Sequence, residues 1–299
     1  MIIEPDFGKK DLFCQPAWVN CLFPEDKIIY HQLQFKNSHL YSAFIIYKKY
    51  FWNFLKDPKF SPYNIYIEHH VDELGSYQAY EKEVELLKML REKCSNYSLV
   101  KCKFHPQIMH VSSASLILDK FYYAPGAKLE YQGNGDNLWD KIFRNARNHI
   151  NHSEKEGIEI KEVEPHQVSK IFAENKYYKE HGFSQSVLVK LYQLFKPLGI
   201  LRLSAAISDQ QILAFTLTIQ WQNETFLILN IINKNDNHRA ANTALLWENI
   251  QYSLNQKCDF NFDGSMNQAI MRRFKSFSAE TFSYCYGEFC NSKLISIFR

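Results

Sequence analysis

The 299-residue sequence predicts an α/β protein built of two lobes. Two observations carry this prediction. In the first half, strand-like runs are followed by one clear helix and then by further strands. In the second half, the order is strand, two helices, three strands, helix, strand, helix and two short strands. Mixed orders of this kind are typical of layered α/β folds, and the chain is long enough for two domains.

The first lobe is expected over residues 1–135. After an irregular opening, Ser76–Cys94 is its clearest helix, because Tyr77, Tyr80 and Val84 fall on one face. A turn-rich stretch at 126–135 closes the lobe. Strands are predicted where β-branched and aromatic residues dominate, at Lys27–Phe35, Leu40–Tyr47, Asn64–Val71, Ser98–Phe104 and Ala114–Tyr123.

A basic helix over 136–156 is expected to connect the lobes. Asp136 is placed to cap its start and Gly157 to end it. One stripe is apolar, with residues four apart at Leu138, Ile142, Ala146 and Ile150. A second stripe is polar and basic, at Lys141, Arg144, Asn148, Asn151 and Lys155, with Arg147 beside it. The basic stripe is either a solvated face or a contact for phosphates, and both interpretations stay open.

The second lobe, 157–299, has a regular order of elements. Its expected strands are Ile158–Val163, Gly199–Ile207, Gln211–Trp221, Glu224–Lys234, Cys258–Asp263, Thr281–Gly287 and Lys293–Phe298. Its expected helices are Pro165–His181, Ser184–Phe195, Ala240–Asn255 and Met266–Phe277. Short polar turns separate the three central strands, so that these are predicted to form consecutive hairpins.

The stretch Cys258–Ala279 combines a short strand, an Asp263-Gly264-Ser265 turn and a basic helix. Gly264 would permit backbone angles that are closed to other residues, and Asp263 or Ser265 could cap the helix. Open α/β sheets also collect ligands at the carboxyl ends of their strands. The stretch is therefore either a plain structural corner or part of a functional site.

Composition narrows the class of protein. Hydrophobic residues make up 46% and charged residues 22%, which is an ordinary globular balance. The 35 basic and 32 acidic residues leave a net charge of +3, too even for a dedicated nucleic-acid-binding protein, although a local basic groove is not excluded. Seven scattered cysteines with no CxxC pair favour reduced thiols. No apolar run of membrane-spanning length and no secretory signal occurs, so we expect a cytoplasmic protein.

Three local patterns, in this order, resemble the GNAT superfamily of N-acyltransferases, and within it the branch that contains the Fem peptidoglycan aminoacyltransferases. The first is Leu138-Trp139 followed by the basic run 144–148 and by 154–157. The second is the helix from Asn242 to Ile250. The third is 262–265 followed by the phenylalanine-rich 273–277. The resemblance is firm over 136–287 and faint before it, and it implies a tandem pair of GNAT folds with a degenerate first copy.

The resemblance implies that an amine attacks an acyl group carried by CoA or an aminoacyl group carried by tRNA. The donor would lie in a splay between Glu224–Lys234 and Cys258–Asp263, with its phosphates at the start of the next helix. The residues expected to bind the donor are Asn230, Arg239, Ala240, Asn242 and Thr243. We expect acyl-CoA first and aminoacyl-tRNA as the alternative.

Asp263 is the expected proton acceptor or amine-orienting group, with helix capping as its structural alternative. Arg273 and Lys275 would neutralise donor or acceptor carboxylates, and surface charge is the alternative for both. Further candidates for substrate contacts are Ser265, Arg144, Arg147 and Tyr284.

Two departures from the family pattern favour a rival hypothesis, a catalytically inactive binding protein of the same fold. Ser278 stands where the family usually has glycine, and the loop 235–242 lacks the glycines that members using acyl-CoA place against the pyrophosphate. The helix at 266–277 also has no tyrosine to protonate a leaving thiolate.

No metal site is expected. His149, His152 and Glu156 are spaced to touch one ion, but a polar helix face explains them better. Fingerprints of dinucleotide, P-loop and serine-hydrolase sites are absent from the sequence.

Overall fold

The computed structural model describes residues 5–6, 8, 11–23, 27–49, 52–69, 77–106, 111–132, 138–175, 183–233, 238–264 and 267–291. The chain divides into two compact units. The first comprises Met1–Ala124 and Ser283–Arg299, and the second Pro125–Phe282. These bounds differ from the expected lobes at 1–135, 136–156 and 157–299, because the end of the chain returns to the first unit and the basic helix belongs to the second.

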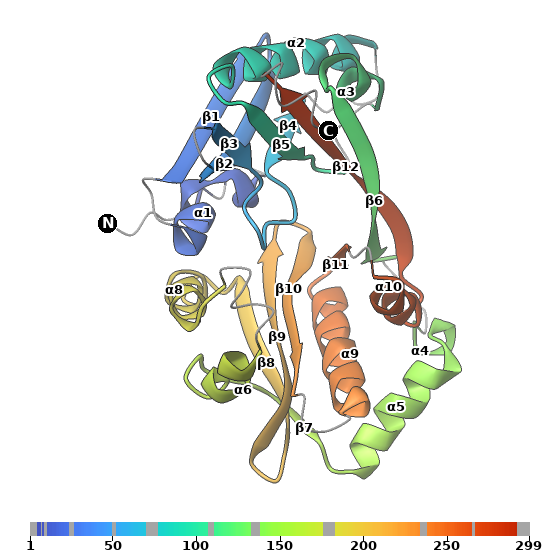
Figure 1. The fold of residues 1–299 in the computed structure, drawn as a ribbon. Coiled ribbons are helices and arrows are strands. Elements are labelled where there is room, and N and C mark those ends of the chain that lie inside the picture. The colour runs from blue at the N-terminus through green and yellow to red at the C-terminus, as the bar shows by residue number, and fades with distance from the viewer. Residues whose placement is uncertain are drawn as a thin grey trace. The chain divides into compact units, whose positions relative to one another are not determined.

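The first unit is a mixed sheet with helices α2 (Tyr77–Lys93) and α3 (Val111–Ile117) on one face (Figure 1). Its strand order is β1-β2-β3-β5-β12-β6, of which the first unit holds the start of β6, residues 120–124, and β4 pairs with β2. The short helix α1 (Pro16–Leu22) contacts β1. The strand bounds are β1 Ile28–Phe35, β2 Ser38–Lys49, β3 Trp52–Lys56, β4 Ile65–Glu68, β5 Leu99–Lys103 and β12 Glu280–Cys290.

Several expectations for this unit are wrong. Helix α1 forms in the opening that was expected to be irregular, and β3 was not predicted. The strand expected at Ala114–Tyr123 is helix α3 followed by β6 (Lys120–Leu129). Strand β6 also runs into the stretch expected to be a turn. Tertiary contacts favour the helical conformation of α3, because its Ser113 hydroxyl donates a buried hydrogen bond to Glu83 of α2 (2.8 Å).

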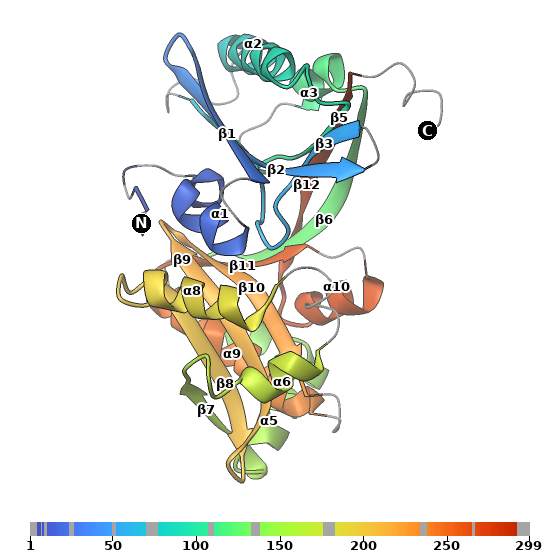
Figure 2. The ribbon, with the colours of Figure 1, turned by 60° about the vertical axis from the view of Figure 1, so that its left-hand side comes forward.

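The second unit is a six-stranded sheet between two helical layers (Figure 2). Helices α5 (Arg144–Lys155) and α9 (Arg239–Asn255) lie on one side, and α6 (Ser169–Glu174) and α8 (Gln185–Phe195) on the other. The strand order is β6-β11-β10-β9-β8-β7, with bounds β7 Glu159–Glu162, β8 Leu201–Ser208, β9 Gln211–Trp221, β10 Glu224–Ile232 and β11 Asp259–Gly264. The hairpins β8–β9 and β9–β10 confirm the prediction.

Two expected helices of this unit are shorter than predicted. The helix at 136–156 is broken into α4 (Leu138–Lys141) and α5, although Gly157 ends α5 with the predicted left-handed backbone (φ 65°). Only α6 is helical among the described residues of Pro165–His181. The predicted cap Asp136 and the predicted strand Lys293–Phe298 lie outside the described residues.

The strand–turn–helix corner is confirmed, with α10 at Gln268–Lys275 after β11. Its cap was predicted wrongly. Asn267 caps α10, because its Oδ1 accepts a hydrogen bond from Ala269 N (2.9 Å). The left-handed residue is Asp263 (φ 58°) and not Gly264. Gly264 is required for another reason, since a β-carbon there would collide with the carbonyl oxygen of Pro125.

Candidate functional site

The second unit opens where strands β10 and β11 stop pairing. The two strands are parallel, and they pair over Glu224–Phe226 and Asp259–Asn261. Past that point β10 continues along β9 as far as Ile232. Helix α9 connects the two strands, so its first turn lies near the carboxyl end of β10, the edge at which open α/β sheets bind ligands.

Strand β10 carries a bulge just before this edge. Its register with β9 pairs Leu227 with Thr218 and then Leu229 with Leu217, so Ile228 is an inserted residue. A bulge interrupts the ladder and turns the following side chains, which is why bulges are common beside active sites. Asn230 follows the bulge directly on the strand.

Three polar side chains meet at this edge, and we call Asn230, Asn242 and Arg273 the arginine–asparagine cluster. They come from β10, the first turns of α9, and α10. Asn242 is fully buried. With its amide oriented to satisfy both neighbours, its nitrogen donates to Asn230 Oδ1 (2.6 Å) and its oxygen accepts from Arg273 Nη2 (2.6 Å) and Nη1 (2.7 Å). Asn242 thus fixes the arginine against the sheet.

Within the described parts of the chain, no acidic side chain neutralises the positive charge of this cluster. Burial, together with repulsion from nearby Arg239, lowers the pKa of Arg273 to about 10. Among the described residues, no carboxylate forms an ion pair with Arg239 or Arg273. Arg239 also begins α9, whose unpaired N–H groups and dipole favour anions. Two arginines and a helix N-terminus therefore form a site prepared for an anion.

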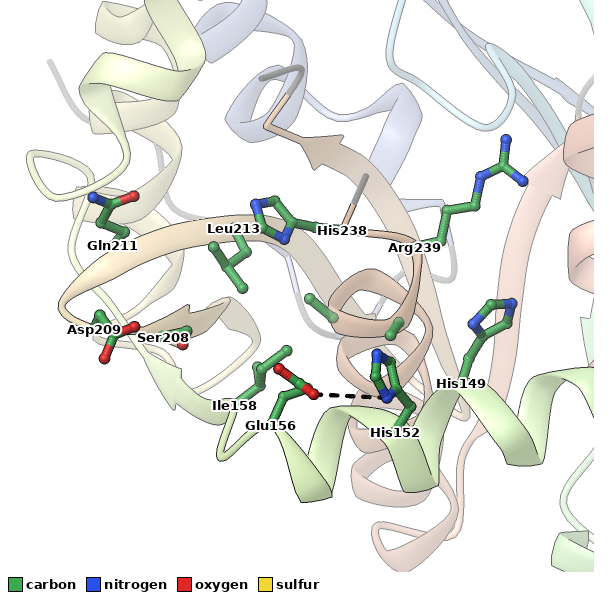
Figure 3. Close-up of a pocket in the computed structure, with 12 residues that line it drawn as sticks. His149, His152, Glu156, Ile158, Ser208, Asp209, Gln211, Leu213, His238 and Arg239 are labelled. Atoms are coloured by element: carbon green, nitrogen blue, oxygen red, sulfur yellow. Dashed lines mark ion pairs between the residues drawn. The ribbon is translucent and has the colours of Figure 1, made fainter. Parts of the chain in front are cut away.

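A cavity of about 560 Å³ adjoins this site (Figure 3). His149 and His152 project into it from α5 and Glu156 from the residue after that helix, while His238 and Arg239 come from the start of α9. His152 Nδ1 lies 3.9 Å from a Glu156 carboxylate oxygen. The remaining wall is formed by the β8–β9 turn and nearby residues, namely Ile158, Ser208, Asp209, Gln211, Leu213, Ala240 and Ala241. In the described part of the chain, no group of three or more histidine, cysteine or acidic residues is arranged to hold a metal ion.

The pKa of His149 is sensitive to the positive charges of the site. Burial lowers its pKa below 6.5, and Arg273, Arg239 and His152 lower it further. The sequence pattern had suggested only a polar helix face for this residue. Its spacing on α5 was visible in the sequence, but its proximity to two arginines from α9 and α10 was not.

We predict that His149 makes folding stability depend on pH. Because its pKa is lowered in the folded state, the unfolded chain binds the proton more readily, so stability is full above about pH 6.5 and falls as the pH drops toward the lowered value. Urea unfolding at about pH 7.5 and about pH 5.5 should show a smaller loss for His149→Gln than for the wild type. The exposed His166→Gln is the control. Identical pH dependence in the wild type and His149→Gln would contradict the prediction.

Asp263 and Lys275, which were predicted to be catalytic, lie at the β11–α10 corner with different exposure, and Thr243, which was predicted to bind the donor, lies on α9. Asp263 is half-buried near the end of β11, and its backbone N–H donates to Asn261 Oδ1 (2.8 Å). Lys275 is exposed on the last turn of α10. The Thr243 hydroxyl is occupied within α9, where it donates to the Arg239 carbonyl oxygen (2.7 Å). Of these three, Asp263 has the location that chemistry at the β11 end would require.

The predicted substrate-contact residues are dispersed. Arg144 and Arg147 lie on α5, and neither side chain forms a hydrogen bond or ion pair with another described residue. Tyr284 is buried in the first unit, where the Lys103 ammonium lies 4.2 Å from its ring centre. Ser265 lies outside the described residues.

Comparison with known proteins finds likeness in structure only. No family model and no curated protein matches the sequence. FemX superposes with a TM-score of 0.63 at 10% identity, covering 99% of this chain and 98% of that one. L-PGS from Bacillus licheniformis gives 0.57 at 13% identity, covering 99% and 96%. A tandem GNAT protein from the clavulanic acid biosynthesis pathway gives 0.50 at 9% identity, covering 87% and 85%.

The chain has a GNAT fold, similar to that of FemX. The matches extend over both units, and one of the matched proteins is itself a tandem GNAT protein. The departure at Ser278 is accommodated within this fold, since Ser278 takes the left-handed backbone that favours glycine (φ 64°) and its hydroxyl donates to the Lys141 carbonyl oxygen. Every helix in the described parts of the chain is too short or too polar to cross a bilayer.

Proposed function

We propose that the protein transfers an acyl or aminoacyl group from a phosphate-bearing donor to an amine, and that the donor binds at the arginine–asparagine cluster. The observation that carries the proposal is the buried bridge of Asn242, which holds Arg273 near Arg239, with no carboxylate partner for either arginine among the residues that the structure describes. Keeping an unneutralised arginine partly buried costs folding free energy. A bound anion would offset that cost, which is why we assign the cluster a ligand.

Two donors have the required chemistry. CoA thioesters carry a pyrophosphate, and aminoacyl-tRNA carries phosphodiesters beside its acyl ester. The fold similarity to FemX and to a tandem GNAT protein supports a transferase of this general type. We expect acyl-CoA first, with Arg239 and Ala240 at the wall of the cavity contacting its phosphates.

The proposed reaction forms one bond and breaks one. The amine nitrogen attacks the carbonyl carbon and gives a tetrahedral oxyanion. That intermediate then expels the thiolate of CoA or the ribose oxygen of tRNA and leaves an amide. The amine must lose a proton, and Asp263 at the end of β11 is the proposed acceptor. The cationic cluster would hold the phosphates, so that donor and acceptor stay close enough to react.

A thermal-shift titration with CoA, acetyl-CoA, a long-chain acyl-CoA and aminoacyl-tRNA tests donor binding. A ligand that binds only the folded protein stabilises it by about 2.7 kcal/mol at a hundred times its dissociation constant, which raises the unfolding midpoint by several degrees. We expect one donor class to raise the thermal unfolding midpoint of the wild type. The same donor should leave the midpoint of Arg239→Ala unchanged. Arg272→Ala, which removes an exposed arginine of α10, should behave as the wild type.

No shift with any donor would contradict the proposal, and so would an equal shift in wild type and Arg239→Ala. A clear, Arg239-dependent shift without transfer to any amine would instead support the rival hypothesis of an inactive binding protein.

A further inference from the structure

One face of the first unit's sheet is covered by helices, and the other carries aromatic and basic side chains. Leu55, Val100 and Phe289 point into the core beneath α2 and α3. Because side chains alternate along a strand, the neighbours of these residues point to the opposite face. There we define the tyrosine–lysine face as Tyr47, Lys56, Lys101, Tyr122 and Tyr286.

The aromatic rings of this face are stacked and accessible. Tyr122 lies parallel to Tyr286, with ring centres 5.2 Å apart and an interplanar angle of 6°. Tyr122 is 52% exposed and Tyr47 is 45% exposed. These rings stand on β2, β6 and β12, and strands lie about 4.8 Å apart. Four strand spacings, or about 19 Å, therefore separate Tyr47 from Tyr122 across the face.

Lysines lie among these rings. Lys56 Nζ is 3.9 Å from the centre of the Tyr47 ring, and Lys103 Nζ is 5.6 Å from that of Tyr286. Burial lowers the pKa of Lys56, and Lys101, Lys59 and Lys49 lower it further, while Asp57 opposes them. The positive charges around the Lys56 ammonium therefore outweigh the negative charge of Asp57.

One carboxylate on the face is already paired. Glu288 lies 3.3 Å from Lys101 on the neighbouring strand, and its side chain is 13% exposed, against 43% for the lysine. The more accessible partner is thus the cation. A polyanion approaching the face meets lysines and aromatic rings first.

We propose that the tyrosine–lysine face binds single-stranded nucleic acid, with bases stacked on Tyr122 and Tyr47 and with phosphates contacted by Lys56 and Lys101. Flat aromatic side chains on an open sheet, with lysines between them, supply the two interactions that single strands need, namely stacking and charge neutralisation. A span of about 19 Å accommodates several nucleotides. The net charge of +3 does not conflict with this, because the lysines are concentrated locally.

The inference is independent of the acyl-transfer proposal, since it uses only residues of the first unit. Binding is measured with no acyl donor present. Loss of RNA binding and loss of donor binding would therefore be separate results.

The test is fluorescence anisotropy of labelled oligonucleotides of about 12 nucleotides, in RNA and DNA form, titrated with the full chain at low salt. We expect both single strands to bind more tightly than a duplex of the same length. Tyr122→Ala should weaken binding about tenfold, whereas Tyr122→Phe should preserve it, because the ring and not the hydroxyl provides the stacking. Lys101→Gln should lower the slope of log affinity against log salt by about one.

Tyr77→Ala is the matched control, because Tyr77 is 71% exposed on α2, on the covered side of the sheet. No binding by the wild type at low salt would overturn the inference. An equal loss in Tyr77→Ala and Tyr122→Ala would also overturn it, as would duplex binding as tight as single-strand binding, which would indicate attraction to charge alone.

Discussion

Asp263→Asn should lower the rate of acyl transfer at least about 100-fold while leaving the unfolding transition in place, because loss of a positioned proton acceptor costs two to four orders of magnitude. Asparagine is the informative replacement. Asp263 has a left-handed backbone (φ 58°), which asparagine adopts more readily than alanine, so Asp263→Asn removes the charge without adding strain. The assay follows N-acyl product from the donor found by thermal shift, with a panel of primary amines.

Glu280→Gln, which removes an exposed carboxylate of β12, should leave the rate unchanged. A full rate in Asp263→Asn would remove Asp263 from the mechanism. A lost rate that is matched by a lost unfolding transition would return it to a purely structural role.

Asn242→Ala should destabilise the second unit by about 2–3 kcal/mol, the second large effect. Asn242 is fully buried and joins Asn230 to Arg273, so alanine removes the hydrogen bonds that Asn242 makes to both side chains. An unsatisfied buried polar group costs about 1–3 kcal/mol, and more when it is charged. Urea unfolding with linear extrapolation measures the difference.

The control is Asn255→Ala at the exposed end of the same helix, which should change stability by less than about 0.5 kcal/mol. Equal stability of Asn242→Ala and Asn255→Ala would show that the amide bridge contributes nothing to folding.

The second unit was largely predictable because its elements carry clear local signals. The three central strands and α8 and α9 begin and end within a few residues of the expected positions, since alternation and helical periodicity mark them in the sequence. The first unit was less predictable. Helix α3 and strand β6 share a stretch that has strand-like composition throughout, and only packing against α2 separates them.

The candidate site was likewise predictable only where local sequence signals mark its residues. The pattern around Asp263 and the resemblance it carries selected Arg239, Asn242 and Arg273 individually. The hydrogen bonds of the Asn242 amide to Asn230 and Arg273 could not be predicted from the sequence, because they require β10, α9 and α10 to lie together. Tyr284 was expected in the second lobe but lies in the first unit, because β12 passes from the second unit into the first, and which sheet a strand joins is not a local property of its sequence.

The central claim is that the arginine–asparagine cluster binds the anionic part of an acyl donor. Calorimetric titration of the donor into wild type and Asn242→Asp tests it most directly. The aspartate can accept the same hydrogen bonds from Arg273 while neutralising its charge. We predict an intact fold in Asn242→Asp and at least about tenfold weaker donor binding, a difference of about 1.4 kcal/mol. Equal affinity of the two proteins would contradict the claim.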